Sequence, residues 1–518
     1  MPARPYRVLT VVFAALVPLL IVAGARASVG IGSGGSESAS PPDDLADETA
    51  IMFPAGDLDA DGGEDAIERR GRSGDLRISA VRGTDGDDLW RVQPADPTSV
   101  IPMGDLDGVP GDDLILVSVR TDFLYPTPER QVTSFTAVRG KDGTQLWTKL
   151  YAGSSAVWGL GQSINVPSTR SIADADGDEA SDLLVAVPAR ALFVGPTSFE
   201  LISGSTGSVI AAFPGVGAMS GAEALMVPDL TGDGLDDVAV LSWIWNDQAG
   251  EHGDLAVYPG LGGPPVWRLA LEGTRPEIEA FHLDGDGVGD LFLETSRWDE
   301  ETAAISTRWV ALSGRDGRSL WHLETPESGW SWPAGDADGD GGEEVVLATD
   351  SGSGTDRITL VGGRDGRPMW ERTHDDDGWP RPVGDVTGDG VVDVMLELRA
   401  GPNEFLSSEL VSGATGETMW TRATRFDPLD GDLDGDGLPD LIGMVPPGLS
   451  YLPVSGATGQ DLWPNPIDAR DVDRIEVALL AEGPAILESG EDAGGYYTAA
   501  RSGSDGTVLW KRAPSGGN

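Results

Sequence analysis

The sequence contains no cysteine among its 518 residues. Disulfide bonds, thiolate zinc sites, cysteine nucleophiles and a lipid-modified N-terminal cysteine are therefore excluded. Histidine is also scarce, with His252, His282, His322 and His374 scattered along the chain, and neither a G-x-S-x-G nor an H-E-x-x-H motif occurs. The common hydrolase and metalloprotease arrangements are thus not indicated, although an acid/base pair among the many carboxylates is not excluded.

Basic residues are few as well. The chain has 35 Lys and Arg against 85 Asp and Glu, a net charge of −50, and its lysines are Lys141, Lys149 and Lys511. Affinity for nucleic acid comes from clustered basic side chains, so nucleic acid is not an expected partner. With 40% apolar residues and 16 tryptophans the chain is able to bury a sizeable core, and its 72 glycines favour turn-rich β structure over long helices.

The N-terminus has the pattern of an export signal. Arg4 and Arg7 precede an apolar stretch over residues 8–25, and a small-x-small sequence, Ala-Arg-Ala, follows as a cleavage site. We predict that residues 1–27 are a signal peptide, or an uncleaved membrane anchor, because the stretch approaches the length of a membrane-spanning helix. The protein is therefore expected to be secreted or, with this segment retained, tethered at the cell surface as a single-pass membrane protein.

Residues 28–48 follow this signal and are rich in Gly, Ser, Pro and acidic side chains. This composition predicts a disordered linker. The repeats described next begin directly after it, and they predict one folded domain over residues 49–518.

An acidic loop followed by an apolar run recurs eight times. Its copies include DLDADGGEDAI from Asp57, DADGDEASDLLVAV from Asp174 and DLDGDGLPDLIGM from Asp432. The remaining copies begin at Asp105, Asp229, His282, Asp336 and Asp385, so that successive loops start 47 to 69 residues apart. This period is in the range of propeller blades rather than helical solenoids.

A second repeated sequence, which ends in tryptophan, recurs at the same period as the acidic loop. Clear copies end at Trp90, Trp147, Trp321, Trp370, Trp420, Trp463 and Trp510. Two weaker copies complete the set. One has Ala211 in place of tryptophan, and the other has Gly262 and Gly263 before Trp267, which brings the number of units to nine. The last unit has the tryptophan string but no acidic loop. A residue repeated at an equivalent site serves the fold, so we interpret these tryptophans as structural.

One unit is predicted to contain about four strands. Short runs such as LLVAV and VVLAT are bounded by Gly and Asp, which fits strands, and the G-x-[TD]-G segment before each tryptophan supplies the glycines of a tight hairpin. Four-stranded sheets repeated at this period are best closed radially, because a ring protects the sheet edges. The prediction is an all-β chain forming a single β-propeller of eight or nine blades, with seven less consistent with the count.

The acidic loops carry the chemistry of a metal site. In DLDGDGLPD, Asp432, Asp434, Asp436 and Asp440 fall at loop positions 1, 3, 5 and 9, with glycines between them that let the backbone curl. Several hard oxygen ligands suit Ca²⁺, which takes about 6–8 oxygens in irregular geometry. An EF-hand is not indicated, because it needs a bidentate Glu at position 12 and flanking helices, whereas an apolar strand has already begun here.

Seven of the eight loops are predicted to supply ligands, for four to seven Ca²⁺ ions in all. Thr231 and Thr387 stand at position 3 of their loops, where a hydroxyl still coordinates, and His282 weakens the loop that it begins. The loop from Asp105 has Val109 at position 5 and is predicted to bind weakly or not at all. The predicted ligands are Asp57, Asp59, Asp61, Asp65, Asp174, Asp176, Asp178, Asp182, Asp229, Thr231, Asp233, Asp237, Asp284, Asp286, Asp290, Asp336, Asp338, Asp340, Glu344, Asp385, Thr387, Asp389, Asp393, Asp432, Asp434, Asp436 and Asp440.

These loops, preceded by FPAGD, IPMGD, WPAGD and RPVGD, resemble FG-GAP/VCBS repeats, the units of the propeller in integrin α-subunits and many bacterial surface proteins. The resemblance implies Ca²⁺ in the turn between the first two strands of a blade and a ligand-binding or adhesive role. The tryptophan string also resembles the repeat of quinoprotein dehydrogenases, in which the tryptophans pack between blades.

Three functions remain open from the sequence. The first and favoured one is a non-enzymatic, monomeric, calcium-stabilised module for binding or adhesion outside the cell, with an unidentified protein or glycan as ligand. The second is an extracellular enzyme, a polysaccharide lyase or a quinoprotein-like oxidoreductase, with its site in the central channel. The third is a purely structural envelope protein. A propeller is compatible with all three, so the fold alone does not choose.

Overall fold

The chain is described by a computed structural model. The described residues are 29–30 and 50–512, except 72–75, 97, 123–129, 154–169, 173, 188–197, 215–220, 247–249, 273–275, 300–303, 351–355, 375–379, 402–403, 430, 446–449, 469–471, 482 and 493–494. The predicted signal peptide or anchor lies outside this part, and so does nearly all of the predicted linker. Within the described part, no helix is long and apolar enough to span a membrane.

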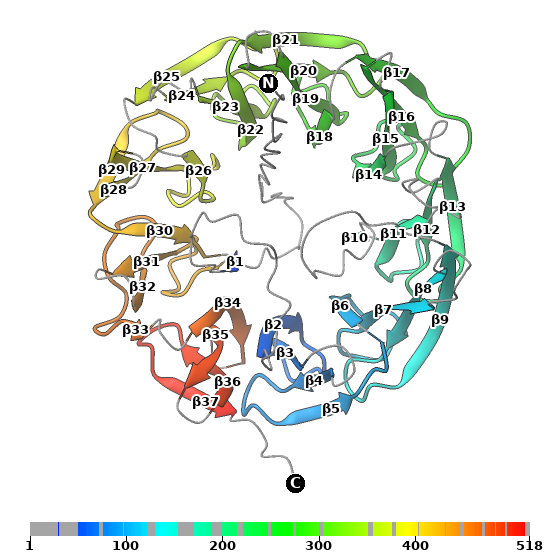
Figure 1. The fold of residues 1–518 in the computed structure, drawn as a ribbon, viewed down its shortest axis with the longest axis vertical. Helices are drawn as coiled ribbons and strands as arrows, with labels where there is room; N and C mark the ends of the chain where they lie inside the picture. The colour runs from blue at the N-terminus through cyan, green and yellow to red at the C-terminus, as the bar shows by residue number, and fades with distance from the viewer. Residues whose placement is uncertain are drawn as a thin grey trace, which may run out of the picture.

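The described chain forms nine antiparallel sheets, each containing four strands that follow one another in the sequence, and one of the sheets has an additional fifth strand from near the N-terminus. Figure 1 shows the sheets arranged in chain order around a ring, with the first strand of each sheet innermost and the fourth outermost. The protein is therefore a nine-bladed, all-β propeller. This confirms the predicted architecture and selects nine from the predicted eight or nine blades.

The blades are numbered 1 to 9 in chain order. Blade 1 contains β2 (Ala50–Gly56), β3 (Asp65–Arg70), β4 (Arg77–Val81) and β5 (Asp88–Val92), and blade 2 contains β6 (Thr98–Pro102), β7 (Leu114–Asp122), β8 (Arg130–Val138) and β9 (Gln145–Gly153). Blade 3 contains β10 (Arg170–Ile172), β11 (Asp182–Val187), β12 (Ser198–Ile202) and β13 (Val209–Pro214), and blade 4 contains β14 (Gly221–Val227), β15 (Asp237–Asn246), β16 (Gly250–Tyr258) and β17 (Trp267–Glu272).

Blade 5 contains β18 (Pro276–Phe281), β19 (Asp290–Asp299), β20 (Ala304–Leu312) and β21 (Ser319–Thr325), and blade 6 contains β22 (Ser328–Gly335), β23 (Glu344–Asp350), β24 (Asp356–Val361) and β25 (Pro368–His374). Blade 7 contains β26 (Pro380–Pro382), β27 (Val394–Gly401), β28 (Glu404–Val411) and β29 (Thr418–Arg422). Blade 8 contains β30 (Arg425–Pro428), β31 (Leu441–Val445), β32 (Ser450–Val454) and β33 (Ile467–Asp468), and blade 9 contains β34 (Val472–Leu480), β35 (Gly483–Asp492), β36 (Gly495–Ser502) and β37 (Val508–Arg512).

Sequence patterns of the strands follow from this stacking. The second strand of a blade lies between two neighbouring blades, so a continuous apolar run such as LLVAV in β11 is buried on both faces. The fourth strand lies at the circumference, and β21 accordingly alternates between exposed and more buried positions. The continuous apolar runs therefore predict not only where strands occur but also which strands lie between neighbouring blades.

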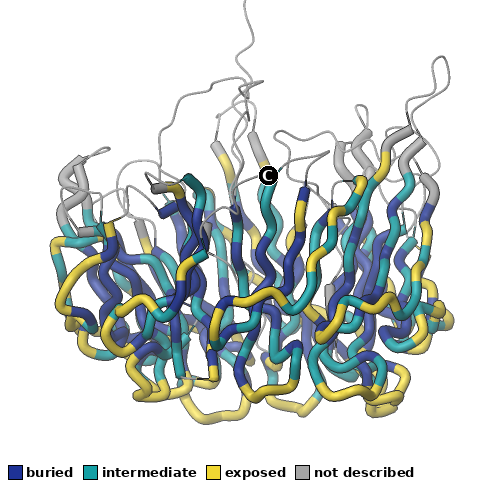
Figure 2. Tube along the Cα trace, turned by 90° about the horizontal axis from the view of Figure 1, so that it is seen from below, coloured by how far each residue is buried: buried dark blue, intermediate teal, exposed yellow. Residues whose placement is uncertain are grey.

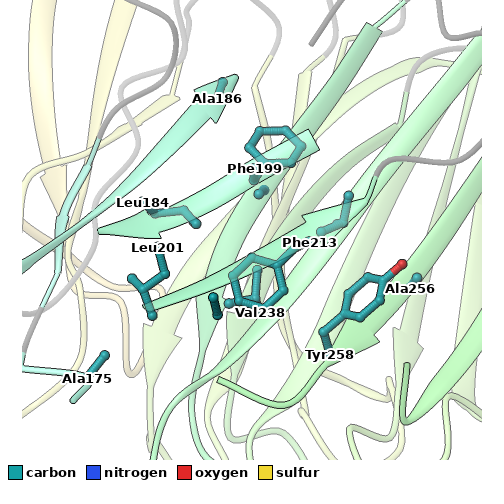
Figure 3. Close-up of a cluster of buried hydrophobic side chains, with 12 residues drawn as sticks. Ala175, Leu184, Ala186, Phe199, Leu201, Phe213, Val238, Ala256 and Tyr258 are labelled. Atoms are coloured by element: carbon teal, nitrogen blue, oxygen red, sulfur yellow. The ribbon is translucent and has the colours of Figure 1, made fainter. Parts of the chain in front are cut away.

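Neighbouring blades share hydrophobic cores. Figure 3 shows one of them, in which Leu184, Phe199 and Leu201 of blade 3 pack with Val238 and Tyr258 of blade 4. Blade 3 is the blade whose expected tryptophan is replaced by alanine. At this seam the rings of Phe213 and Tyr258 lie 5.9 Å apart and fill space between the two blades.

Eight of the nine seams use the repeated tryptophan in the same way. The indole Nε1 donates a hydrogen bond to the carbonyl of a glycine in the next blade, for example from Trp370 to Gly413 at 2.8 Å and from Trp420 to Gly456 at 3.0 Å. The equivalent donors are Trp90, Trp147, Trp267, Trp321, Trp463 and Trp510. The indole also lies against the turn of that blade, where a Cβ on Gly416, at φ 70°, would come within 2.8 Å of Trp370. These tryptophans have the structural role that the repeat predicts.

The ring closes by packing blade 9 against blade 1. Trp510 donates to the carbonyl of Gly83 across this seam, and the backbone N–H of Glu64 donates to the carbonyl of Leu479 at 2.8 Å. In blade 9, β34 and β35 are joined by residues 481–482 alone, so the last unit lacks an acidic loop as predicted. A short strand from the predicted linker region, β1 (Val29–Gly30), pairs antiparallel with β34.

The acidic loops and the hairpin turns before the tryptophans lie on one face of the ring. Each acidic loop joins the first two strands of its blade, and each hairpin turn joins the third and fourth, which places both at the same end of an antiparallel sheet. Figure 2 shows largely exposed turns along the lower edge of the ring. The carboxylates of the eight loops are therefore gathered on a single face, here called the loop face.

Candidate metal centres in the acidic loops

The ninth position of every acidic loop is a buried carboxylate. In the loop from Asp432, the side chain of Asp440 is fully buried, and it accepts the N–H of Leu433 at 2.7 Å and that of Gly456, in the hairpin turn, at 3.2 Å. The same pair of bonds recurs at Asp65, Asp113, Asp182, Asp237, Asp290 and Asp393. This carboxylate ties the loop to the turn of its own blade, a role that the sequence reasoning missed.

Burial has a strong effect on the protonation of these groups. It raises the pKa of Asp65 to about 7, against the lowering effect of the hydrogen bond from Gly83. It likewise raises the pKa of Asp182, Asp393 and Asp440 to about 6, and the neighbouring loop carboxylates add to the effect. The loops thus concentrate negative charge that a cation would stabilise.

The first position of the loop shapes the backbone. In the loop from Asp432, one carboxylate oxygen accepts the N–H groups of Gly435 at 2.6 Å and Asp436 at 3.2 Å, and the other accepts the N–H of Gly437 at 2.7 Å. Gly435 and Gly437 have φ of 84° and 89°, in the left-handed region that glycine adopts without strain. The predicted curl of the loop around its carboxylates is therefore present.

Five loops bring three carboxylates together. In each of them the ligand oxygens lie within 4.8 Å of one another: Asp57, Asp59 and Asp61; Asp105, Asp107 and Asp113; Asp174, Asp176 and Asp182; Asp336, Asp338 and Asp340; and Asp432, Asp434 and Asp440. The loop from Asp105, predicted as the weakest, is among them. In these five loops Asp65, Asp178, Glu344 and Asp436 lie outside the clusters.

Two of the other predicted loops have threonine at the third position. The hydroxyl of Thr387 donates to Asp385 at 3.2 Å, and that of Thr231 donates to Asp229 at 3.4 Å. Both hydroxyls therefore point at the first carboxylate of their loop, as an oxygen ligand would. The further predicted ligands in these loops and in the loop from His282 are Asp233, Asp237, Asp284, Asp286, Asp290, Asp389 and Asp393, and no cluster of three carboxylates contains them in the described part of the chain.

In four of the eight loops, an arginine pairs with one carboxylate. Arg82 contacts Asp59 at 2.9 Å and Arg139 contacts Asp107 at 2.5 Å, each from the hairpin turn of the same blade. Similar pairs join Arg315 to Asp286 at 2.6 Å and Arg364 to Asp340 at 3.2 Å. Among the described residues, no arginine pairs with a carboxylate of the loops from Asp174, Asp229, Asp385 and Asp432. The loops therefore divide into an arginine-paired set and a set with uncompensated charge.

The pKa shifts of individual loop carboxylates reflect their surroundings. Burial, together with the charges of neighbouring carboxylates, raises the pKa of Asp176 and of Asp434, which both stand at the third loop position. In contrast, burial of Asp286 is outweighed by hydrogen bonds from Arg315 and the N–H of Val288 together with the charge of Arg315, so that the pKa of Asp286 is lowered. The loops from Asp174 and Asp432 combine a carboxylate cluster with the absence of an arginine, within the described chain, and have the arrangement best suited to hold a cation.

A second set of acidic residues joins neighbouring loops to one another. At the eighth loop position, Asp112 accepts the N–H of Asp57 in the preceding blade at 2.9 Å, and Glu343 accepts that of His282 at 2.8 Å. Glu64 does the same for Leu479 across the closing seam. The signal in the sequence was an acidic pair at positions 8 and 9, of which the ligand assignment used only position 9.

Buried glutamates form a further polar layer between blades. Glu488 pairs with Arg501 at 2.7 Å, and Glu68, Glu397, Glu409 and Glu476 have arginine partners of the same kind. Between blades 5 and 6 the arrangement differs, since the partners of Glu294 among the described residues are the neutral donors Trp309 Nε1 at 3.0 Å and Ser331 Oγ at 2.8 Å. One oxygen of nearby Glu279 is buried with no hydrogen-bond partner. Burial raises the pKa of both glutamates to about 7.

The fold and these loops define a nine-bladed β-propeller with a repeated acidic loop. No protein-family model matches the chain, and no curated protein matches it in sequence. Among solved structures, it is similar to BamB from Moraxella catarrhalis, at 15% identity and a TM-score of 0.35, with 67% of this chain and 88% of that chain covered.

Two further structures are similar at the same level. The Dos1 propeller is 10% identical, with a TM-score of 0.37 and coverage of 80% of this chain and 94% of that chain. The quinohemoprotein alcohol dehydrogenase ADHIIG from Pseudomonas putida HK5 is 10% identical, with a TM-score of 0.28 and coverage of 78% and 65%. At these TM-scores the likenesses carry no argument about function.

Proposed function

We propose that the protein is an exported, calcium-binding β-propeller of the FG-GAP/VCBS type. It acts, as a monomer, as a secreted or cell-surface module for binding or adhesion, with an extracellular protein or glycan as its ligand. The calcium ions lie in the acidic loops and stabilise the loop face.

The observation that carries this proposal is the convergence of carboxylates in loops of one repeated backbone form. Two unit charges about 4 Å apart repel by about 4 kcal/mol at an effective dielectric constant of about 20. Three carboxylates whose oxygens lie within 4.8 Å of one another therefore favour a bound cation over an empty loop. Carboxylate, hydroxyl and backbone oxygens are the donor set of Ca²⁺, and no nitrogen or sulfur ligand occurs in the five clusters.

The arginine pairs indicate the order in which the loops bind calcium. Where Arg82 or Arg139 contacts a loop carboxylate, its guanidinium supplies the positive charge that a cation supplies elsewhere. We therefore propose that the loops from Asp174, Asp229, Asp385 and Asp432 fill first, and that arginine-paired loops account for any further ions up to the predicted seven.

Binding is favoured over catalysis because the polar residues are distributed around the ring. The same loop, the same buried ninth carboxylate and the same tryptophan recur from blade to blade, which is how residues serving a fold are placed. A catalytic centre needs unlike groups at one point.

Calorimetric titration of the chelator-treated protein with CaCl₂ tests the proposal. Replacing Asp434 by Asn removes a charge but keeps the oxygen that accepts the N–H of Asp436. The variant should lose one binding event or bind it at least about tenfold more weakly. Asp365→Asn is the matched control, since Asp365 accepts the N–H of Arg367 in the same way but lies in a hairpin turn. The absence of saturable binding by the wild type would overturn the proposal.

A further inference from the structure

A polar cavity lies in the seam that closes the ring. It has a volume of about 320 Å³ and lies between the face of blade 1 that is turned toward blade 9 and the last strand, β37. Its lining residues are Glu68, Arg70, Arg77, Ser79, Gly86, Asp87, Asp88, Arg91 and Arg512. This volume is at the lower end of the range of about 300–1,000 Å³ that is usual for small-molecule sites.

Four arginines converge on this cavity. Arg70 and Arg77 stand directly opposite each other on β3 and β4, and Arg91 stands opposite Ser79 on β5 and β4. Arg512 enters from blade 9. With three acidic residues in the lining, the formal charge of the cavity is 4 − 3 = +1, in a protein whose net charge is −50. Like charges directly opposite each other in a sheet are unfavourable, so Arg70 and Arg77 gain from the carboxylate of Glu68 and from any further anion in the cavity.

The acidic residues of the lining orient the arginines. Glu68 holds Arg70 at 2.8 Å and Arg512 at 3.3 Å, while Asp88 holds Arg512 at 2.5 Å and also pairs with Arg91. The Nε of Arg91 donates to Ser79 Oγ at 3.2 Å. The guanidinium group of an arginine has five N–H donors in a fixed plane. The contacts of Arg70, Arg91 and Arg512 therefore fix the orientation of these groups without using all of their donors. The Nε–H of Arg512 is buried and has no hydrogen-bond partner.

Among the described residues, those that line the cavity are charged or polar apart from Gly86, and the stems of the arginines supply its apolar surface. A ligand that fits this lining is mainly polar and carries an oxyanion to match the guanidinium planes, which bind carboxylates with two parallel hydrogen bonds. A bare ion would use only part of 320 Å³. The combination fits a molecule of monosaccharide size with one carboxylate and several hydroxyl groups.

We propose that this cavity binds a sugar acid of the uronate type through its carboxylate, with Arg91, Arg70 and Arg512 as the residues that recognise the charge and Ser79 and Glu68 as partners that fix their geometry. The proposal deepens the proposed binding function by naming the ligand class. It does not depend on the acidic loops, because none of the nine lining residues belongs to the proposed calcium ligands.

Calorimetric titration with sodium glucuronate, sodium acetate and glucose at constant ionic strength tests the site. Glucuronate should bind with one site per chain, acetate at least about tenfold more weakly, and glucose without measurable heat. Arg91→Gln should weaken glucuronate binding by at least about tenfold, because the lost carboxylate contacts are charge-assisted. Arg91 is half exposed, so this variant is expected to fold. Arg367→Gln is the matched control, since Arg367 also pairs with an aspartate next to a hairpin turn but lies in blade 6.

Three outcomes would overturn the site: no saturable binding of glucuronate, binding of glucose as tight as that of glucuronate, or equal weakening by Arg91→Gln and Arg367→Gln. The comparison of the three probes on the wild-type protein holds even if Arg91→Gln misfolds. Titration of the same sample with CaCl₂ separates a failure of the cavity from a failure of the calcium loops.

Discussion

The two glutamates between blades 5 and 6 make the stability of the ring depend on pH. Glu279 and Glu294 have pKa values raised by burial to about 7, from an ordinary value of 4.5, and Glu277 adds a further negative charge. An acid with a raised pKa in the folded state contributes stability that is complete below pH 4.5 and is lost as the pH rises through about 7. The rise from 4.5 to about 7 in the pKa of one such carboxyl corresponds to about 3–4 kcal/mol, at about 1.4 kcal/mol per pKa unit.

Replacing Glu279 by Gln removes one of the two charges and keeps the shape of the side chain. The variant should match the wild type at pH 5 and exceed it at pH 8, with a melting temperature higher by a few degrees. Differential scanning calorimetry at pH 5, 6, 7 and 8 measures the effect. Glu488→Gln is the control: Glu488 is paired with Arg501, so its loss should destabilise the protein at pH 5 and pH 8 alike. A parallel pH profile of Glu279→Gln and the wild type would refute the reasoning.

Three further predictions concern the seams and the loops. Trp370→Phe should lower the free energy of unfolding, measured by urea denaturation, by about 1–3 kcal/mol, because it leaves the carbonyl of Gly413 unpaired. Trp332→Phe is the control, since its Nε1 has no hydrogen-bond partner and its removal should lack that effect. Equal losses in the two variants would contradict the role of the tryptophan bond in the seam. Ala60→Gly should raise stability by up to about 1 kcal/mol, since Ala60 has φ 63°, while Ala337→Gly, at a loop position without positive φ, should lower it. Arg139→Gln removes the positive charge beside the clustered carboxylates of its loop. The melting temperature of this variant should fall in EDTA and recover in CaCl₂. A melting temperature that does not depend on calcium would count against the role of the arginine.

The repeat in the sequence was sufficient to predict the ring. Strands, hairpins and acidic loops recur at a period that fits one blade. A string present in nine units and a loop present in eight limited the blade number to eight or nine and predicted the missing loop of the last unit. These features are local, because each depends on residues within one unit. The side-chain period and the turn glycines are enough to place them.

What the sequence did not predict depends on contacts between distant segments. The pair of Arg82 with Asp59 spans 23 residues, and the bond from Asp57 to Asp112 spans 55 residues and joins two blades. The pair of Arg512 with Glu68 spans 444 residues and exists only because the ring closes. Such partners are set by the packing of one blade against the next. The division of the loops into arginine-paired and uncompensated sets therefore required the structure.

The amount of calcium that the folded protein retains tests the central claim most directly. The purified protein is equilibrated with CaCl₂, passed through gel filtration and analysed for metal by inductively coupled plasma mass spectrometry. The account predicts four to seven calcium ions per chain, at least one fewer in Asp434→Asn, and an unchanged content in Asp365→Asn. A folded wild-type protein that retains no calcium would contradict it.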